Sequence, residues 1–476
     1  AARLDGYAVD YPDIARALVI GATVEGRELR ALVVSADPDE DEAEPTVRIV
    51  GGVHGDECLA VEMVLSVIEW LLSGYGEDSL VTRLVDEAEV LLVPVVNADG
   101  YSGETASRPN ARGIDLNRNF SFAWLLEEVP YYDQGPRPFS EPETRAVRDA
   151  SLDFNPVVGL GYHTPSRLID APWNWTPFHP PDEALIQAMG EAYAGSSDYP
   201  VTFGWDWIWV YGGFTDWAHG VQGTLDWTLE MRSDTDLEWD LHRGGLEALL
   251  AYLFQGARGT VTDAATGAPL AARIEVLPEG APVFTDPASG YFHRLLLPGT
   301  YAITAAAQGY GPGRAEGVAV AGWELTTVDL ALEPLPSGSP EHGFAVDGTT
   351  MSEEVGWEYH EGEEVYLYAT EPSDALGPPD SRFYSLGPGG SITVDLGPRS
   401  AVVDGSDTDL LVVSGTGSDD PAVVQLSAER DGPFVDAGRG TGDIEVDLDG
   451  TGLGSARFVR VVDDGDSEFN GAEPGY

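Results

Sequence analysis

Lysine is absent from this chain of 476 residues, and cysteine occurs once, at Cys58. The basic residues are therefore 25 arginines against 81 aspartates and glutamates, which gives a formal net charge of −56. Such a charge repels nucleic acids and anionic membrane surfaces, so neither is expected as a partner. A single cysteine excludes an intrachain disulfide framework. No apolar run approaches the roughly 20 residues that a membrane-spanning helix needs.

The remaining composition is typical of a folded protein, with 43% hydrophobic and 10% aromatic residues. The length predicts about two to four domains. Solubility, or adaptation to salt, explains the acidity better than an acidic binding tail does. The chain begins at Ala1 without a signal-peptide pattern. Together with the acidity and the extracellular-style modules described below, this start predicts a processed protein that is secreted or periplasmic.

The first part of the chain, residues 1–256, alternates strand and helix patterns and predicts an α/β domain. The strand-like runs lie at 89–96, 156–162 and 223–229, and the helical patterns at 142–151, 183–194 and 237–254.

The rest of the chain has the character of β-structure. Residues 257–333 are short strand-like runs separated by turn signals, which predict a β-sandwich of about seven strands. Residues 334–340 are rich in proline, serine and glycine and predict a linker. Residues 341–476 predict a second all-β sandwich domain. This domain is expected to be truncated, because the chain stops within a strand-like run at Tyr476.

Candidate metal ligands lie at the ends of two buried strands. His54 and Glu57 follow the strand-like run 46–50. An imidazole and a carboxylate three residues apart can bind one cation when the backbone turns tightly between them, as nearby glycines permit. His163 follows the apolar run 157–162, at the edge where open α/β sheets bind their ligands. A structural histidine bonded to backbone is the alternative for His163.

Three further segments carry side chains suited to hydrolysis. Glu230 ends the strand-like run 225–229, beside tryptophan, where a carboxyl group could have the raised proton affinity of a general base. An ordinary glutamate at a strand end is the alternative. Asn117 and Arg118 can together hold a carboxylate, the arginine as a bidentate fork. Arg108 could supply a second positive charge for a developing oxyanion.

These motifs, in this order, resemble the zinc metallocarboxypeptidases, the family of carboxypeptidases A and B and of the N/E branch. The resemblance covers about the first 255 residues and implies a mixed sheet with helices on both faces. It implies one zinc ion bound by His54, Glu57 and His163, with the fourth position open for water. It also implies that Asp115, without binding the metal itself, orients the His54 side chain.

The same resemblance implies a reaction. Glu230 removes a proton from water and passes it to the departing amine, and Arg108 stabilises the oxyanion. Asn117 and Arg118 bind the free carboxylate of a peptide or protein substrate. The implied function is therefore zinc-dependent hydrolysis of the C-terminal peptide bond.

Two positions depart from the family pattern. Ile208 stands where the family has a tyrosine over the substrate, and Tyr211 or Trp209 could replace that tyrosine. Thr215, which falls in the specificity pocket, is neither the acid expected for basic C-terminal residues nor a large apolar group. The departures leave two alternatives: a cell-wall peptide or amide hydrolase of the same family, and a catalytically lapsed surface-binding protein.

The two β-regions carry resemblances of their own. Residues 257–333 resemble the transthyretin-like regulatory domain of the N/E branch, and residues 341–476 resemble a discoidin-like jelly-roll module. The latter resemblance implies a cell-surface or carbohydrate ligand. The acidic loops 404–409 and 463–468 could coordinate calcium, with a solvated acidic surface as the simpler alternative.

Overall fold

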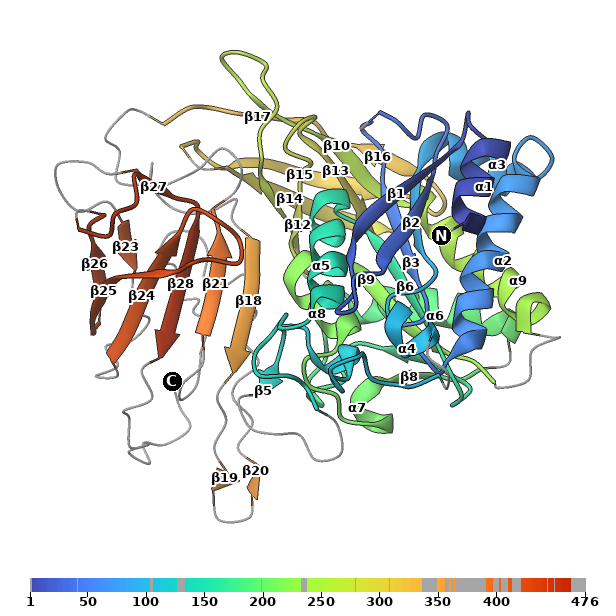
Figure 1. The fold of residues 1–476 in the computed structure, drawn as a ribbon. Helices are drawn as coiled ribbons and strands as arrows, with labels where there is room; N and C mark the ends of the chain where they lie inside the picture. The colour runs from blue at the N-terminus through green and yellow to red at the C-terminus, as the bar shows by residue number, and fades with distance from the viewer. Residues whose placement is uncertain are drawn as a thin grey trace.

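The fold is described from a computed structural model. The described residues are 2–40, 42–102, 106–125, 133–197, 199–232, 238–278, 280–307 and 309–335, with shorter stretches between 349 and 463. Figure 1 shows an N-terminal part of mixed helices and strands, a β-sandwich beside it, and a second β-part that ends the chain.

The N-terminal part is built on a mixed sheet. Its strands are β1 (Ala15–Ala22), β2 (Glu28–Val34), β3 (Thr46–Val50), β4 (Glu89–Val93), β6 (Val158–His163), β7 (Leu168–Ala171), β8 (Val201–Phe203) and β9 (Leu225–Glu230). They form one eight-stranded sheet in the order β1-β2-β4-β3-β6-β9-β7-β8. The central strands β4, β3, β6 and β9 are parallel, whereas β2 and β7 flank them in antiparallel register.

Helices cover both faces of this sheet (Figure 1). They are α1 (Ala2–Asp10), α2 (Cys58–Gly74), α3 (Ser79–Glu87), α4 (Ala98–Ser102), α5 (Pro142–Phe154), α6 (Glu183–Ser197), α7 (Gly204–Trp207), α8 (Phe214–Gln222) and α9 (Glu238–Leu250), with 3₁₀ turns η1 (Leu116–Arg118) and η2 (Ala251–Phe254). One apolar core lies under α2, α6 and α9, and another under α5 and α8. The predicted α/β fold class is confirmed.

The described helices include no single one that is both long and apolar enough to cross a membrane. Only α2 and α3 taken together meet that criterion, and they do so across a bend of 98°.

The alternation of side chains between the two faces of a strand determines which residues face the candidate site described below. In β9, Leu225, Trp227 and Leu229 belong to the core under α2, α6 and α9. Because successive side chains of a strand point to opposite faces, Thr228 and Glu230 face the other side of the sheet. At β9 the sheet therefore has an apolar face and a face that carries polar groups, although an apolar core also lies on that second face under α5 and α8.

The second part consists of β10 (Gly256–Asp263), β11 (Arg273–Leu277), β12 (Val283–Phe284), β13 (Tyr291–Leu295), β14 (Gly299–Ala306), β15 (Gly313–Val320), β16 (Leu325–Thr327) and β17 (Leu330–Leu332). Two four-stranded sheets enclose one apolar core, as predicted for a β-sandwich. The sequence predicts about seven strands and the structure has eight. The difference arises because two short strands, β16 and β17, pair one after the other with the single strand β10.

The last part contains β18 (Thr349–Val355), β19 (Tyr359–His360), β20 (Glu363–Glu364), β21 (Ser391–Asp395), β22 (Val402–Val403), β23 (Leu410–Val412), β24 (Pro421–Ser427), β25 (Val435–Thr441), β26 (Ile444–Val446), β27 (Ser455–Ala456) and β28 (Phe458–Asp463). A six-stranded sheet, β25-β24-β28-β21-β18-β5, includes the two-residue strand β5 (Trp124–Leu125) of the N-terminal part. The loop 404–409 and residues 464–468, which could coordinate calcium or form a solvated acidic surface, lie outside the described residues, as do residues 336–340 of the predicted linker.

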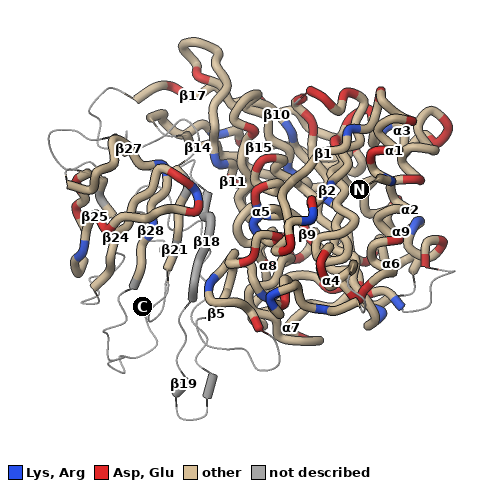
Figure 2. Tube along the Cα trace, viewed as in Figure 1, with Lys and Arg blue, Asp and Glu red and all other residues tan. Residues whose placement is uncertain are grey.

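Among the described residues, Figure 2 shows acidic residues along the N-terminal part and around β24 and β25. Opposite charges nevertheless join these two parts. Arg148 of α5, 3% exposed, donates to both carboxylate oxygens of Asp431 at 2.9 and 3.1 Å. Arg430 donates to Asp149 at 2.9 Å. Each side thus contributes one arginine and one aspartate, and the two ion pairs hold the loop between β24 and β25 against α5.

Replacing Asp431 with alanine is expected to weaken this contact by roughly 1–2 kcal/mol, because the buried Arg148 loses its bidentate partner. Small-angle scattering should then show a larger radius of gyration than in the wild type. Asp436→Ala is the matched control, since Asp436 accepts from Gln425 within its own hairpin. An unchanged scattering profile for Asp431→Ala would contradict this account of the contact.

Candidate metal centre and cavity

The turn between β3 and α2 carries the first two candidate ligands. His54 lies in this turn, and Glu57 is the residue immediately before α2. Gly55 between them packs against α4, where an added Cβ would lie 2.3 Å from the carbonyl carbon of Gly100. Only glycine fits this close approach, so the tight turn that brings the two side chains together depends on it.

The third candidate ligand comes from the neighbouring strand. β6 is parallel to β3 on one side and to β9 on the other. His163, the last residue of β6, is the register partner of Glu230, the last residue of β9. Because parallel strands end at a common edge, both side chains reach the turn that carries His54.

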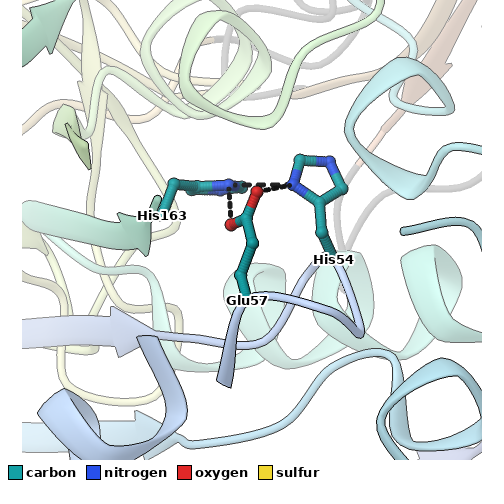
Figure 3. Close-up of side chains that lie close together, drawn as sticks. All are labelled: His54, Glu57 and His163. Carbon is teal, nitrogen blue, oxygen red and sulfur yellow. Dashed lines mark hydrogen bonds and ion pairs between the residues drawn. The ribbon is translucent and has the colours of Figure 1, made fainter. Parts of the chain in front are cut away.

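Figure 3 shows the three side chains pointing toward one another. Glu57 approaches His54 Nδ1 with Oε1 at 2.8 Å and His163 Nδ1 with Oε2 at 3.0 Å. The two Nδ1 atoms lie 3.1 Å apart. One ligand atom from each residue falls within 4.8 Å of the others, and all three residues are buried.

This donor set fits zinc. Catalytic zinc sites combine histidine nitrogens and a carboxylate as three protein ligands, and two histidines with one glutamate is an established combination. The convergence of two ring nitrogens and a carboxylate on one point also favours a cation there, because neutral ring nitrogens that face each other need a proton or a metal between them.

The charges of the cluster stabilise one another. Burial acts to raise the pKa of Glu57, but His163 and His54 outweigh it and hold that pKa below its usual range. Burial acts to lower the pKa of His54, yet Asp115 and Glu57 raise it overall. Glu57 is therefore ionised at neutral pH, as a metal ligand must be.

Asp115 contacts His54 from the side away from the cluster. Its Oδ1 lies 3.1 Å from His54 Nε2 and accepts from the Asn117 backbone N–H at 3.0 Å. Its Oδ2 accepts from Arg108 Nε at 3.0 Å. Burial acts to raise the pKa of Asp115, but His54, Arg118 and Arg108 lower it overall. One buried carboxylate thus links the histidine, the arginine and the η1 turn.

A cavity of about 250 Å³ opens beside the cluster. The predicted site residues that line it are His54, Arg108, Asn117, Arg118, Thr215 and Glu230. They come from the turn after β3, from the loop that contains η1, from α8 and from β9. The tertiary structure therefore brings together residues that lie up to 176 positions apart in the chain, from His54 to Glu230.

Glu230 lies at the metal end of this cavity and is 8% exposed. Burial raises the pKa of its carboxyl group, His163 opposes that effect, and Glu57 adds to it. The net shift is upward, toward the range in which a carboxylate accepts protons effectively.

Tyr211 is not among the residues that line the cavity, and its ring lies 6.3 Å from that of Trp209. A substrate contact of Tyr211 therefore stays a prediction. Ile208 does line the cavity, with Trp207 beside it, and both are more than one-third exposed. Sequence reasoning placed Ile208 over the substrate but did not name Trp207, which the end of α7 brings to the rim.

Sequence reasoning also missed Asp170, Asn174 and Thr228 in the cavity wall. An acidic residue in the apolar segment 168–171 was the available signal for Asp170. That signal could not be read without knowing that β7 pairs with β9.

Comparison with known proteins gives two family matches. Residues 1–251 match the zinc carboxypeptidase family, and residues 256–333 match the carboxypeptidase regulatory-like domain.

Individual relatives share about 30% identity with the chain. Human carboxypeptidase D is 31% identical over 346 residues, which cover 64% of this chain and 24% of that protein. The mouse carboxypeptidase N catalytic chain is 30% identical over 379 residues, which cover 68% of this chain and 82% of that one. The chain thus spans about a quarter of carboxypeptidase D and most of the carboxypeptidase N chain. Among solved structures, carboxypeptidase A from Helicoverpa armigera aligns with a TM-score of 0.46 at 22% identity, over 52% of this chain and 69% of that one.

Replacing His163 with alanine is expected to remove bound zinc, because two ligands remain where three are needed. Elemental analysis of protein purified in zinc-containing buffer measures this directly, with about one ion per chain in the wild type. His179→Ala is the control, since the side chain of His179 is 75% exposed and pairs only locally with Glu183. Equal zinc content in wild type and His163→Ala would rule out the predicted ligand set.

Proposed function

The chain belongs to the zinc carboxypeptidase family, and from that premise we propose that it removes the C-terminal residue from peptides and proteins. The substrate's free carboxylate binds at one end of the cavity, and its last peptide bond lies at the metal end. The reaction is hydrolysis, so one water is consumed and a shortened chain and a free amino acid are released.

One observation supports this proposal above all others. A candidate zinc ligand, a buried glutamate and a buried arginine all line the same cavity, through His54, Glu230 and Arg118. A binding protein has no need to place a proton acceptor and a carboxylate-binding group beside a metal centre. The combination is suited to hydrolysis at a free carboxylate.

His54, Glu57 and His163 would hold the zinc ion, which when bound polarises a carbonyl group and makes water more acidic. Asp115 keeps the His54 ring in the orientation that its 3.1 Å contact defines. The cluster is therefore oriented before substrate arrives.

Glu230 moves the protons. Its carboxylate takes a proton from the attacking water, and the same carboxyl group then delivers that proton to the nitrogen of the departing amino acid. The burial that raises the pKa of Glu230 suits both steps, since a weakly basic carboxylate would accept the proton poorly. No proton needs to enter from bulk solvent during the reaction.

Positive charge in the wall of the cavity orients the substrate. Arg118 is 4% exposed, and its guanidinium donates to the Asn117 carbonyl at 2.8 Å, which keeps it in place beside the cavity. The Asn117 side chain is held in turn, because its Oδ1 accepts from the Phe214 N–H at 2.9 Å. Arg108 lies nearer the metal end, with Nη1 3.6 Å from Glu57, where it can stabilise negative charge that develops on the scissile carbonyl oxygen.

Glu230→Gln tests the proton-transfer role. The amide keeps the shape of the side chain but cannot accept a proton, so kcat should fall by a factor of about 10² to 10⁴ while zinc content is unchanged. Glu183→Gln is the control, because the Glu183 side chain is 36% exposed, pairs with His179 and does not line the cavity. Near-wild-type turnover by Glu230→Gln would show that another group acts as the base.

Paired peptides with a free or an amidated C-terminus test the direction of attack. The free peptide should lose its last residue, and the amidated one should resist, because Arg118 and Asn117 then lack the carboxylate they bind. A chelator should abolish the cleavage. Cleavage of amidated peptides at internal bonds would favour a different hydrolase, and resistance of every peptide would favour a protein that binds without catalysis.

A further inference from the structure

A buried polar network lies in the apolar core under α6 and α9, and the proposed reaction makes no direct use of it. Its members are Tyr193 of α6, Tyr199 in the segment after α6, and Glu238 and His242 of α9. None of the four is more than 1% exposed. Burying polar groups costs free energy unless they are hydrogen-bonded, so their bonds show what the network holds together.

Each hydrogen bond of the network has a defined donor and acceptor. The Arg232 backbone N–H donates to the Tyr199 hydroxyl oxygen at 3.1 Å, and the Tyr199 O–H donates to Glu238 Oε2 at 2.8 Å. His242 Nε2 lies 3.0 Å from the same Oε2 and donates to it, because a carboxylate only accepts. His242 Nδ1 then accepts from the Tyr193 hydroxyl group at 2.7 Å. Burial lowers the pKa of His242 although Glu238 acts against this shift, which agrees with a ring that carries one proton.

The network ends at the backbone next to Glu230. Arg232 lies two residues beyond Glu230, and Met231 between them donates its backbone N–H to the His163 carbonyl at 2.8 Å. The chain leaves the sheet at this point, since Glu230 is the last residue of β9. Two successive backbone N–H groups therefore fix its path, one through β6 and the other through Tyr199.

The Tyr199 ring also contacts a second segment that reaches Glu230. The guanidinium carbons of Arg167 and Arg232 each lie 5.8 Å from the centroid of this ring. Arg167 has a φ of 60°, a left-handed conformation that a residue other than glycine keeps only when its surroundings support it. The residue before it, Ser166, donates its backbone N–H to Glu230 Oε2 at 3.4 Å. Tyr199 thus contacts both the segment that follows Glu230 and the segment that hydrogen-bonds its carboxylate.

Stability alone does not require such a network. Buried polar groups can often be replaced by well-packed apolar ones without loss of stability, and the surrounding core is already apolar. Directional hydrogen bonds add what apolar packing lacks, which is one preferred position for the groups that they join. For Glu230 this position matters, because an error of about 1 Å at a reacting group can lower a rate by about 10²-fold.

We propose that Tyr199, Glu238 and His242 are positioning residues, which hold Glu230 in place for proton transfer through the backbone N–H of Arg232 and the ring contact with Arg167. The inference rests on the proposed function, because it assigns the network to the proton-transfer step. None of the three side chains lines the cavity, so their effect passes through the backbone on either side of the glutamate.

Tyr199→Phe keeps the ring beside the two arginines and removes the hydroxyl group that joins Arg232 to Glu238. We expect kcat for a peptide with a free C-terminus to fall by about 10- to 100-fold. KM should change by less than about twofold, because Asn117 and Arg118 lie in the η1 loop, outside the network. Zinc content should stay at the wild-type value.

Tyr291→Phe is the matched control. Tyr291 belongs to β13 of the sandwich, and its hydroxyl group also bonds a buried histidine, with His293 Nδ1 at 2.9 Å. This variant loses the same kind of buried hydrogen bond without any link to Glu230. It should lower the melting temperature, as Tyr199→Phe does, but leave kcat unchanged.

Glu238→Gln and Glu238→Leu form a second pair of variants. Glutamine keeps a carbonyl oxygen that accepts from Tyr199 and His242, whereas leucine has a similar size and no acceptor. Glu238→Gln should therefore retain most of kcat, and Glu238→Leu should lose it as Tyr199→Phe does. If Tyr199→Phe does not fold, this pair decides.

Adding Tyr199→Phe to Glu230→Gln separates positioning from general damage. Once residue 230 no longer accepts a proton, its placement contributes little, so the second substitution should lower the residual kcat by less than about twofold. Damage elsewhere in the cavity would instead lower kcat by the same factor in both backgrounds.

The outcomes separate this inference from the proposed function. Wild-type kcat in folded Tyr199→Phe, or an equal further loss in the Glu230→Gln background, would overturn the positioning role and leave the carboxypeptidase function intact. Equal kcat in the two Glu238 variants would do the same. If the wild type removes no residue from any free C-terminus, the proposed function fails, and this inference fails with it.

Discussion

The parallel alignment of β3, β6 and β9 is the constraint on which the whole site depends. The three strands end at one edge of the sheet, so the turn after β3 meets His163 and Glu230 there. A register slip of one residue would turn the side chains of a strand to the opposite face and remove its contribution. The apolar core that surrounds Trp227 and Leu229 on the other face prevents such a slip, because it would bury polar groups in place of apolar ones. Packing on one face of the sheet thus secures the chemistry on the other.

Buried charge is the second constraint, and buried charged side chains are stabilised by partners of opposite charge. The Arg48–Asp226 ion pair lies beneath Gly159, where an added Cβ would collide with the Asp226 carboxylate. Asp115 is compensated by His54 and Arg108. Against this background Asp170 is an exception in the wall of the cavity, because its Oδ1 has no hydrogen-bond partner within the described part of the chain.

Much of the N-terminal fold could be predicted from the sequence, since long periodic segments give strong signals. The helix expected over 142–151 exists and runs on to Phe154, where Asn155 ends it in a left-handed conformation. The strand expected over 89–96 is shorter, Glu89–Val93, because the chain leaves the sheet before Pro94. The short strands β7 and β8 gave no comparable signal. Three or four residues are too few for a period to be recognised, and their pairing with distant strands stabilises them.

The sequence by itself determined the metal chemistry. The residue types at His54, Glu57 and His163, in their order and with their strand-end positions, indicate a family whose zinc dependence does not need the coordinates. Only the tertiary structure decided what surrounds the metal. It left Tyr211 out of the cavity lining, added Trp207 beside Ile208 at the rim, and placed Asp170 beside Thr228. The physical reason is that a ligand motif is local and reads directly from the chain, whereas the wall of a cavity is made by pairing between segments that no local pattern connects.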